Sequence, residues 1–253
     1  NYDKHITIFS REGRLHQVEY AFTAVSVPGL TSIGVKGKDT VVFITQKKVP
    51  DKLLDSTSVT HLYNVTKNIG ICVTGLIADG QAVVEMARQF AGEFKYKNGY
   101  DIPLPYLTQK LADRAQLYTQ HAFMRAYGIT SILIGIDENK GPSLFMADPA
   151  GHYSGYQACA CGSKEQEAIN YLEKKIKAAN DNNNNNGTNN SNENNLTYDQ
   201  VMETAVLALQ TTLGNDLKPS DIEIGVVTKE NPTFHQLSLV EIDTLLNKIG
   251  SRD

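Results

Sequence analysis

The 253-residue sequence predicts an α+β protein, a four-layer αββα sandwich in which two antiparallel sheets pack on each other between layers of helices. Three observations lead to this prediction. Runs rich in β-branched residues come in pairs joined by short turns, which favours hairpins over βαβ crossovers. Helical runs follow each group of strands, also in pairs. Each helical run is apolar on one side only, so each should cover one outer sheet face.

The first four strands are expected to form two hairpins. Gly37-Lys38-Asp39 supplies the turn of the first hairpin, and Lys67-Asn68 lies between the strands of the second. The runs on either side of these turns are rich in valine, isoleucine and threonine, which pack well on a pleated surface. The predicted strands are Thr31–Gly37, Thr40–Gln46, Leu62–Val65 and Ile69–Thr74.

Two amphipathic helices should follow these hairpins. Val83, Ala87 and Phe90 recur at helical spacing in the first helix, and a second stripe begins at Leu104. Val84 lies off the first stripe, so we expect it to contact either another chain or solvent. The next strands are predicted at Ile129–Ile136, Ser143–Ala147 and Tyr153–Ala160.

Three later helices are marked by capping boxes, in which a hydroxyl residue precedes a glutamate or glutamine by three positions. These boxes begin at Ser163, Thr197 and Ser238. Because each box can satisfy free backbone donors at a helix start, each predicts a helix that begins just after it. The last strands are expected between the second and third of these helices, at Ile222–Thr228 and Thr233–Gln236.

Residues 180–195 differ from the rest of the chain in composition. Eleven of these sixteen residues are asparagine, and none is apolar. Such a segment buries nothing that could offset the entropy lost on ordering. We therefore expect a disordered insert between two helices, which the fold can carry because loop-closure cost grows slowly with length. An interaction tract is the alternative.

Composition argues against several classes of function. A net charge of −4 offers no basic field for phosphate, so no nucleic-acid partner is expected. No apolar window is long enough to span a bilayer, so no membrane partner is expected either. The sequence contains no phosphate-binding loop and no metal-ligand spacing, so neither a cofactor nor a metal is expected; Cys159 and Cys161 are expected to be core residues. Three cysteines are too few for a disulfide scaffold and favour a reducing compartment.

Residues 1–29 form a segment ahead of the first core strand. Ser10-Arg11-Glu12-Gly13 has the residue types of a β-turn. A short helix should follow, with Leu15, Val18, Phe22 and Val25 on its buried side, and Pro28-Gly29 should end it. This added element either packs on a sheet edge or covers another part of an assembly.

The N-terminal motifs closely resemble the signature of proteasome alpha subunits. The resemblance covers nearly the whole chain except the asparagine-rich insert. Lys47–Asp55 and His5–Phe9 look most like the alpha type-6 paralogue of that family. The motifs that carry the family resemblance are Tyr2-Asp3-Lys4, Phe9-Ser10, Glu12–Leu15, Gln17–Ala21, Lys47-Lys48-Val49, Thr74-Gly75, Tyr118-Thr119-Gln120, Gly135-Ile136-Asp137, Asp148–Gly151 and Phe234.

The resemblance implies one proteasome-type domain over residues 1–253, with the fold of the N-terminal-nucleophile hydrolases. It implies a non-catalytic member of the seven-subunit outer ring of the 20S core particle, which scaffolds the ring, gates substrate access and serves ubiquitin-dependent protein degradation. The implied partners are neighbouring alpha subunits, beta-ring subunits and regulatory particles. The implied location is the cytoplasm and nucleus, and the basic pairs Lys47-Lys48 and Lys174-Lys175 are either import signals or solvated surface.

No catalytic residue is expected in this chain. Catalytic beta relatives use an N-terminal threonine whose free amine is the general base. Here the nucleophile position aligns with Leu30, the supporting acid with Gln46 and the supporting lysine with His61, while Thr31 has an amide nitrogen. Two alternatives remain: an active threonine-type hydrolase, which requires autoprocessing before Thr31, and a free-standing enzyme or binding module.

The resemblance also implies two non-catalytic sites. Tyr2, Asp3, Arg11 and Tyr20 occupy the positions of a cluster that holds the open pore, with Arg11 in place of the usual proline. Proline would preset the backbone angle at that turn position, so we expect this chain to depart from the standard cluster. His61 occupies the lysine position that pairs with the C-terminal carboxylate of regulator tails. Since a neutral imidazole is a weaker carboxylate partner than an ammonium, we expect weak tail binding there.

Overall fold

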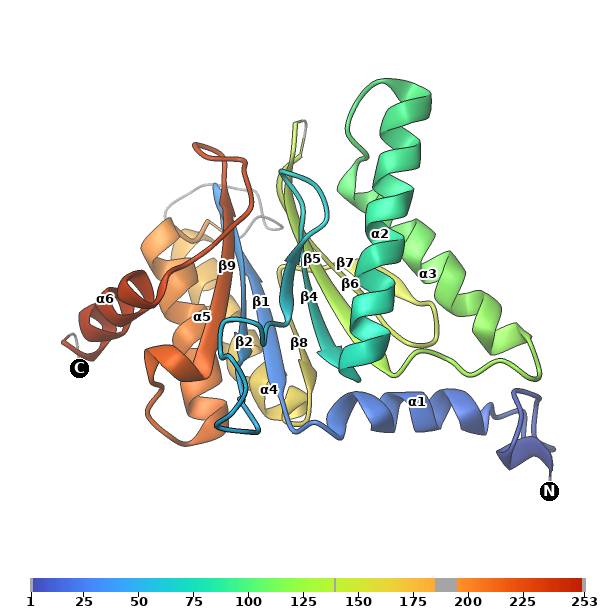
Figure 1. The fold of residues 1–253 in the computed structure, drawn as a ribbon. Coiled ribbons are helices and arrows are strands. Elements are labelled where there is room, and N and C mark those ends of the chain that lie inside the picture. The colour runs from blue at the N-terminus through green and yellow to red at the C-terminus, as the bar shows by residue number, and fades with distance from the viewer. Residues whose placement is uncertain (1, 139, 185–194, 252–253) are drawn as a thin grey trace.

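The computed structural model describes residues 2–138, 140–184 and 195–251. Two antiparallel sheets face each other, and helices cover both outer faces, so the four-layer αββα prediction is confirmed (Figure 1). In the described part of the chain the first sheet has five strands, in the spatial order β10 (His235–Gln236), β9 (Ile222–Thr228), β2 (Thr40–Gln46), β1 (Thr31–Lys36) and β8 (Ala158–Gly162). The second has the order β3 (Leu62–Asn64), β4 (Gly70–Gly75), β5 (Ile129–Asp137), β6 (Gly141–Ala147) and β7 (Tyr153–Gly155).

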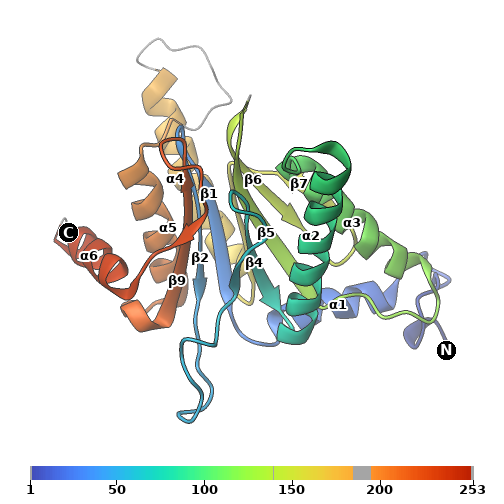
Figure 2. The same ribbon diagram turned by 45° about the horizontal axis from the view of Figure 1, so that its top comes forward.

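The helices form the outer layers in sequence-local pairs. Helices α2 and α3 cover the second sheet, whereas α4 and α5 cover the first, with α6 beyond them (Figures 1 and 2). Helix α1 lies across one end of the sandwich and contacts β4 and β5. No helix in the described ranges is both long and apolar enough to cross a membrane. The helices are α1 (His16–Ser26), α2 (Ile77–Asn98), α3 (Leu104–Gln120), α4 (Glu165–Asn184), α5 (Tyr198–Leu213) and α6 (Leu239–Gly250), with short 3₁₀ turns η1 (Tyr2–Lys4) and η2 (Pro219–Asp221).

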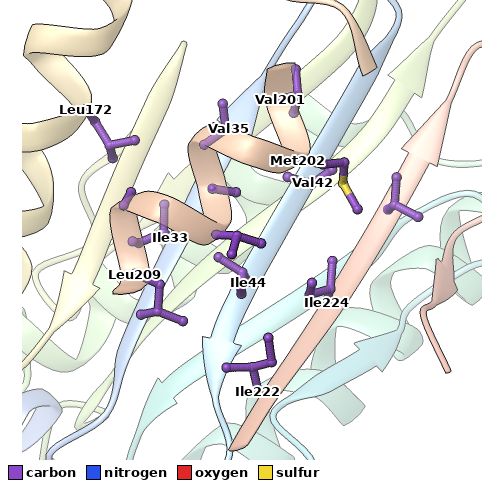
Figure 3. Close-up of a cluster of buried hydrophobic side chains, with 14 of the residues drawn as sticks. Ile33, Val35, Val42, Ile44, Leu172, Val201, Met202, Leu209, Ile222 and Ile224 are labelled. Atoms are coloured by element: carbon purple, nitrogen blue, oxygen red, sulfur yellow. The ribbon is translucent and has the colours of Figure 1, made fainter. Parts of the chain in front are cut away.

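Three apolar clusters hold the four layers together. The central one lies between the sheets and includes Phe43 and Ile132, neither of which is exposed to solvent. A second joins α2 and α3 to their sheet. The third joins α4, α5 and α6 to the first sheet, where Met202 and Leu209 of α5 belong to one cluster with Ile33 of β1 and Val42 of β2 (Figure 3). Burial of each large side chain contributes about 1.5–3 kcal/mol relative to exposure.

Most predicted strands are found within a residue or two of their predicted ends, but the expected strand Tyr153–Ala160 is wrong. The chain forms two strands there, and they belong to different sheets. Tyr156 donates its backbone N–H to Leu144 of β6 in the second sheet, whereas the Gln157 carbonyl accepts a bond from Lys36 of β1 in the first. The backbone therefore changes sheets between two consecutive residues.

Two of the three capping boxes are confirmed. Gln200 Oε1 accepts the Thr197 backbone N–H at 2.9 Å, and Glu241 Oε2 accepts that of Ser238 at 2.7 Å. The box at Ser163 is wrong, because α4 begins only at Glu165. Ser163 Oγ instead lies 3.4 Å from Thr31 Oγ1.

The burial of two apolar side chains differs from the prediction. Val84 is buried against the second sheet rather than exposed for a contact, because α2 packs there over a wider stripe than its first three apolar positions indicated. In α1, Phe22 is 43% exposed and Ala21 takes the buried position between Val18 and Val25. Val18, Ala21 and Val25 also follow helical spacing, and the packing of α1 on β4 and β5 buries this set instead of the predicted one.

The expected disordered insert is partly corrected. The backbone of residues 180–184 continues helix α4, so the insert does not begin at residue 180. Asn195 lies in the irregular segment before α5. Residues 185–194 lie outside the described residues.

Candidate functional site

The three positions aligned with catalytic residues meet in one cleft of about 1150 Å³. Leu30 precedes β1, Gln46 ends β2 and His61 precedes β3. Because β1 and β2 pair antiparallel, the start of one lies beside the end of the other, with Ser32 opposite Thr45. Strand β3 lies at the edge of the facing sheet. The cleft therefore opens between the ends of the two sheets.

The cleft does not carry the groups that threonine catalysis requires. Leu30 offers only a buried hydrocarbon side chain at the nucleophile position. The Thr31 nitrogen is an amide that donates to Gln46 Oε1 at 2.9 Å, so it has no lone pair for a general base. Gln46 is a neutral amide where the catalytic relatives need a carboxylate. The Leu30 carbonyl accepts the Ser163 N–H at 2.9 Å, which fixes the backbone here.

His61 is held in the cleft wall by its backbone. Its N–H donates to Glu223 Oε2 at 2.9 Å and its carbonyl accepts from Val73 at 3.0 Å. The residue is only 4% exposed, and this burial lowers the pKa of the His61 imidazole; the nearby Glu223 carboxylate opposes the shift. The lowered pKa favours the neutral ring at pH 7.

Three lysines also line the cleft: Lys47, whose Nζ lies 3.9 Å from Glu223 Oε1, and two that were not assigned to a site from the sequence. Lys48 Nζ donates to the Gly29 carbonyl at 2.8 Å, and Lys164 Nζ donates to that of Thr212 at 2.9 Å. Each is thus paired with a neutral carbonyl rather than with a carboxylate. No local sequence pattern indicates this, because Lys48 is adjacent to the cleft only once β2 has paired with β1.

Behind the cleft, a chain of buried hydroxyls links the two sheets. Ser32 Oγ lies 2.6 Å from Thr45 Oγ1 and 2.7 Å from Thr74 Oγ1, and the Cys161 thiol donates to Thr74 Oγ1 at 3.4 Å. Burial raises the pKa of the Cys72 thiol to about 12 and also raises the pKa of Cys161. These thiols stay protonated and do not act as nucleophiles. Within the described ranges, no three His, Cys, Asp or Glu side chains are grouped as metal ligands would be.

The N-terminal segment contains the four residues expected to form a gate cluster. The backbone of Tyr2 begins η1, and Asp3 follows it. Asp3 Oδ1 is buried and has no hydrogen-bond partner among the residues that the structure describes. Arg11 is exposed in the predicted turn, and Tyr20, 47% exposed, stacks on His16 with ring centroids 6.3 Å apart. No hydrogen bond or ion pair joins Asp3, Arg11 and Tyr20 to one another in the part of the chain that the structure describes.

The turn itself is confirmed. The Gly13 N–H donates to the Ser10 carbonyl at 3.0 Å, and Gly13 has a φ of +76°, which glycine adopts without strain. Ser10 Oγ accepts the Arg14 N–H at 3.1 Å. Arg14 also binds Glu19 through two bonds of 2.7 and 2.9 Å, and this contact lowers the pKa of the Glu19 carboxyl. The turn is thereby fixed to α1.

Comparison with known proteins agrees with this geometry. Residues 27–227 match the family described as proteasome subunit, and residues 2–24 match the N-terminal signature of the A-type proteasome subunits. The chain is 45% identical to a probable proteasome subunit alpha type-1 of Schizosaccharomyces pombe, over 100% of this chain and 98% of the relative. It is 42% identical to a proteasome subunit alpha type-6 of Caenorhabditis elegans, over 100% and 97% of the two chains.

A less similar relative also matches nearly the whole length of this chain. A proteasome subunit alpha of Metallosphaera sedula is 36% identical over 98% of this chain and 96% of its own. An alpha type-6 subunit is thus among the relatives, as the resemblance predicted. The chain belongs to the proteasome subunit family and carries its alpha-type N-terminal signature.

Proposed function

We propose that this chain is a non-catalytic subunit of the seven-membered alpha ring of the 20S proteasome core particle. In this role it contacts neighbouring alpha subunits and the beta ring, and it serves ubiquitin-dependent protein degradation in the cytoplasm and nucleus. The observation that supports this best is the cleft, where Leu30, Gln46 and His61 occupy all three catalytic positions without the groups that threonine chemistry needs. The names of its relatives support the same ring.

An electrophilic peptide that captures N-terminal threonines tests the absence of catalysis. In particles that contain this chain, adducts are expected on other subunits only, and the mass of this chain should still include the residues before Thr31. A labelled chain that begins at Thr31 would establish the alternative, an active threonine-type hydrolase. Native mass tests the third hypothesis, since a free-standing protein would remain near its chain mass of 27.9 kDa.

The gating role rests on the N-terminal segment. Asp3 has a buried carboxylate oxygen without a partner in residues 2–138, 140–184 and 195–251, and Phe9 is 72% exposed. Both features fit a segment completed by an adjacent subunit, with Tyr2, Asp3, Arg11 and Tyr20 as the expected gate cluster. Replacing Asp3 by asparagine should reduce regulator-stimulated peptide hydrolysis by the particle. Asp113→Asn, on the exposed side of α3, is the matched control.

The docking role rests on the cleft. A regulator tail ends in a carboxylate. Lys48 and Lys164 line the cleft beside the neutral His61, and neither has an acidic partner among the described residues. The lysines supply the favourable charge that the imidazole does not, but each must exchange a bond to a backbone carbonyl for the bond to the tail. This pocket should therefore bind tails weakly.

A further inference from the structure

The loop between α3 and β5, residues 121–128, supports the N-terminal segment. The Thr7 N–H donates to the Ala122 carbonyl at 2.9 Å, and Thr7 Oγ1 donates to the Met124 carbonyl at 3.2 Å. Thr7 is 5% exposed, whereas its neighbours Ile8 and Phe9 are exposed. Thr7 is therefore the buried anchor of a segment whose other described side chains between residues 3 and 10 are exposed or half-buried.

The loop is irregular, so it depends on side chains for its position. Arg125 makes two bonds to Asp79, with Nη1 2.6 Å from Oδ2 and Nη2 2.8 Å from Oδ1. Arg125 Nη1 also donates to the Ala126 carbonyl at 3.0 Å, and Asp79 Oδ2 accepts the Gly128 N–H at 2.9 Å. One carboxylate in the first turn of α2 thus holds the second half of the loop at two points.

The pair is placed at the rim of the fold rather than in its core. The Arg125 side chain is 63% exposed, while that of Asp79 is 11% exposed. Helix α2 has its own apolar face against the second sheet, including Val83 and Ala87. Loss of the arginine therefore leaves the helix packed and releases mainly the loop. A lysine at this position cannot reproduce the planar two-bond contact.

We propose that the Asp79–Arg125 pair, acting through the loop of residues 121–128, positions the N-terminal segment of this chain. Asp79 and Arg125 are positioning residues, because their contacts reach Thr7 only through the loop backbone. Thr7 lies five positions after Tyr2, and those five steps span at most about 18 Å when the chain is fully extended. A fixed Thr7 therefore limits where the start of the segment can reach. Its consequence for the pore rests on the proposed gating function.

Hydrogen exchange in the assembled particle tests the positioning. Arg125→Lys is expected to raise amide exchange in residues 3–10 by about tenfold, because a contact to the loop is lost and local opening becomes easier. Exchange in β1 and β2 should not change. Arg88→Lys is the matched control, since Arg88 lies on α2 and binds the Asn64 carbonyl away from the loop. Unchanged exchange in residues 3–10, or increased exchange throughout the chain, would overturn the proposal.

A second variant tests whether the effect of Arg125 reaches the N-terminal segment through the contact of Thr7 with the loop, rather than through general destabilisation of the chain. Thr7→Val removes the bond to Met124 while keeping the side-chain volume and the backbone bond to Ala122. It should raise exchange in residues 3–10 alone. Combined with Arg125→Lys, its effect should be less than additive, since both changes act on one contact. Full additivity would contradict the route through the loop.

The rate of peptide hydrolysis by particles without a regulator then measures how far the pore is open. If the proposed function holds, Arg125→Lys should raise hydrolysis of a short fluorogenic peptide about twofold or more, whereas Arg88→Lys should not. Raised exchange with unchanged hydrolysis would support the positioning of the segment and contradict its gating role. Raised hydrolysis with unchanged exchange would overturn the positioning.

Discussion

The cleft at the sheet ends and the N-terminal segment differ in how fully their polar groups are paired inside the chain. In the cleft, the Thr31 amide, the His61 amide and the Lys48 ammonium each have a partner within 3 Å. In the N-terminal segment, a buried oxygen of Asp3 has no partner within the described part of the chain, and Phe9 is exposed. Groups that are complete within the chain stabilise its fold, whereas incomplete ones point to a neighbouring molecule.

The largest effect on stability is expected from a change in the apolar layer between the two sheets. Phe43→Ala should lower the free energy of unfolding by about 3–5 kcal/mol, because the ring is fully buried between the sheets and leaves a cavity. Phe9→Ala should change it by less than about 0.5 kcal/mol but reduce incorporation into particles. Urea denaturation of the purified chain measures the free energy of unfolding, and native mass measures incorporation into particles. A large stability loss for Phe9→Ala would contradict the comparison.

Glu223 tests whether the cleft is held by its internal polar contacts. Glu223→Ala should destabilise the chain by about 1–3 kcal/mol, since the buried His61 N–H then lacks an acceptor. Lys47, whose Nζ lies 3.9 Å from Glu223, also loses its partner. Glu85→Ala is the control, because its ion pair on α2 is exposed. Equal losses for the two variants in urea denaturation would refute the assignment.

The buried imidazole of His61 predicts that the cleft makes the stability of the chain depend on pH below about 6.5. Because the folded pKa of His61 is lowered by burial, the unfolded chain binds the proton more readily. Its contribution to stability is full above the unfolded pKa of about 6.5 and is lost as the pH falls below it, by at most about 1.4 kcal/mol per pH unit. Unfolding of His61→Gln at pH 7.5 and pH 5.5 should show a smaller difference than the parent chain. His152→Gln, at an exposed site, should match the parent.

The smallest expected effect concerns ligand affinity at the cleft. His61→Lys should raise the affinity of a regulator-tail peptide for the particle about two- to fivefold, and Lys48→Ala should lower it by a similar factor, because a partly exposed ion pair contributes up to about 1 kcal/mol. Amidation of the peptide's terminal carboxylate should remove both differences. No gain for His61→Lys would end the proposed weakness of this pocket.

Features of the fold that depend on local sequence were predicted, whereas features that depend on contacts between distant segments were not. Strands β2 and β9 were predicted to the residue because β-branched runs end at polar turns on both sides. The division of Tyr153–Ala160 into two strands was not predicted. Tyr156 and Gln157 bond to different sheets, and no local sequence pattern indicates this. Phe22 was misplaced because helical spacing identifies an apolar face but not how closely a helix approaches its neighbour.

The candidate site was predictable in a similar way. Leu30, Gln46 and His61 were located through the family resemblance, and the structure brings them into one cleft. Lys48 and Lys164 were missed because their ammonium groups reach the cleft only after strand pairing and through long side chains. The support of Thr7 by the loop of residues 121–128 was also invisible, because 117 positions separate Thr7 from Met124.

The crossing between β7 and β8 has a consequence for how the molecule yields under force. Tyr156 is hydrogen-bonded in one sheet and Gln157 in the other, so no free residue lies between the two sheets at this point. A force that separates the sheets must therefore break the backbone hydrogen bonds of β7 and β8 together. The sandwich should therefore rupture in a single mechanical event, rather than by one layer sliding off and leaving the other intact.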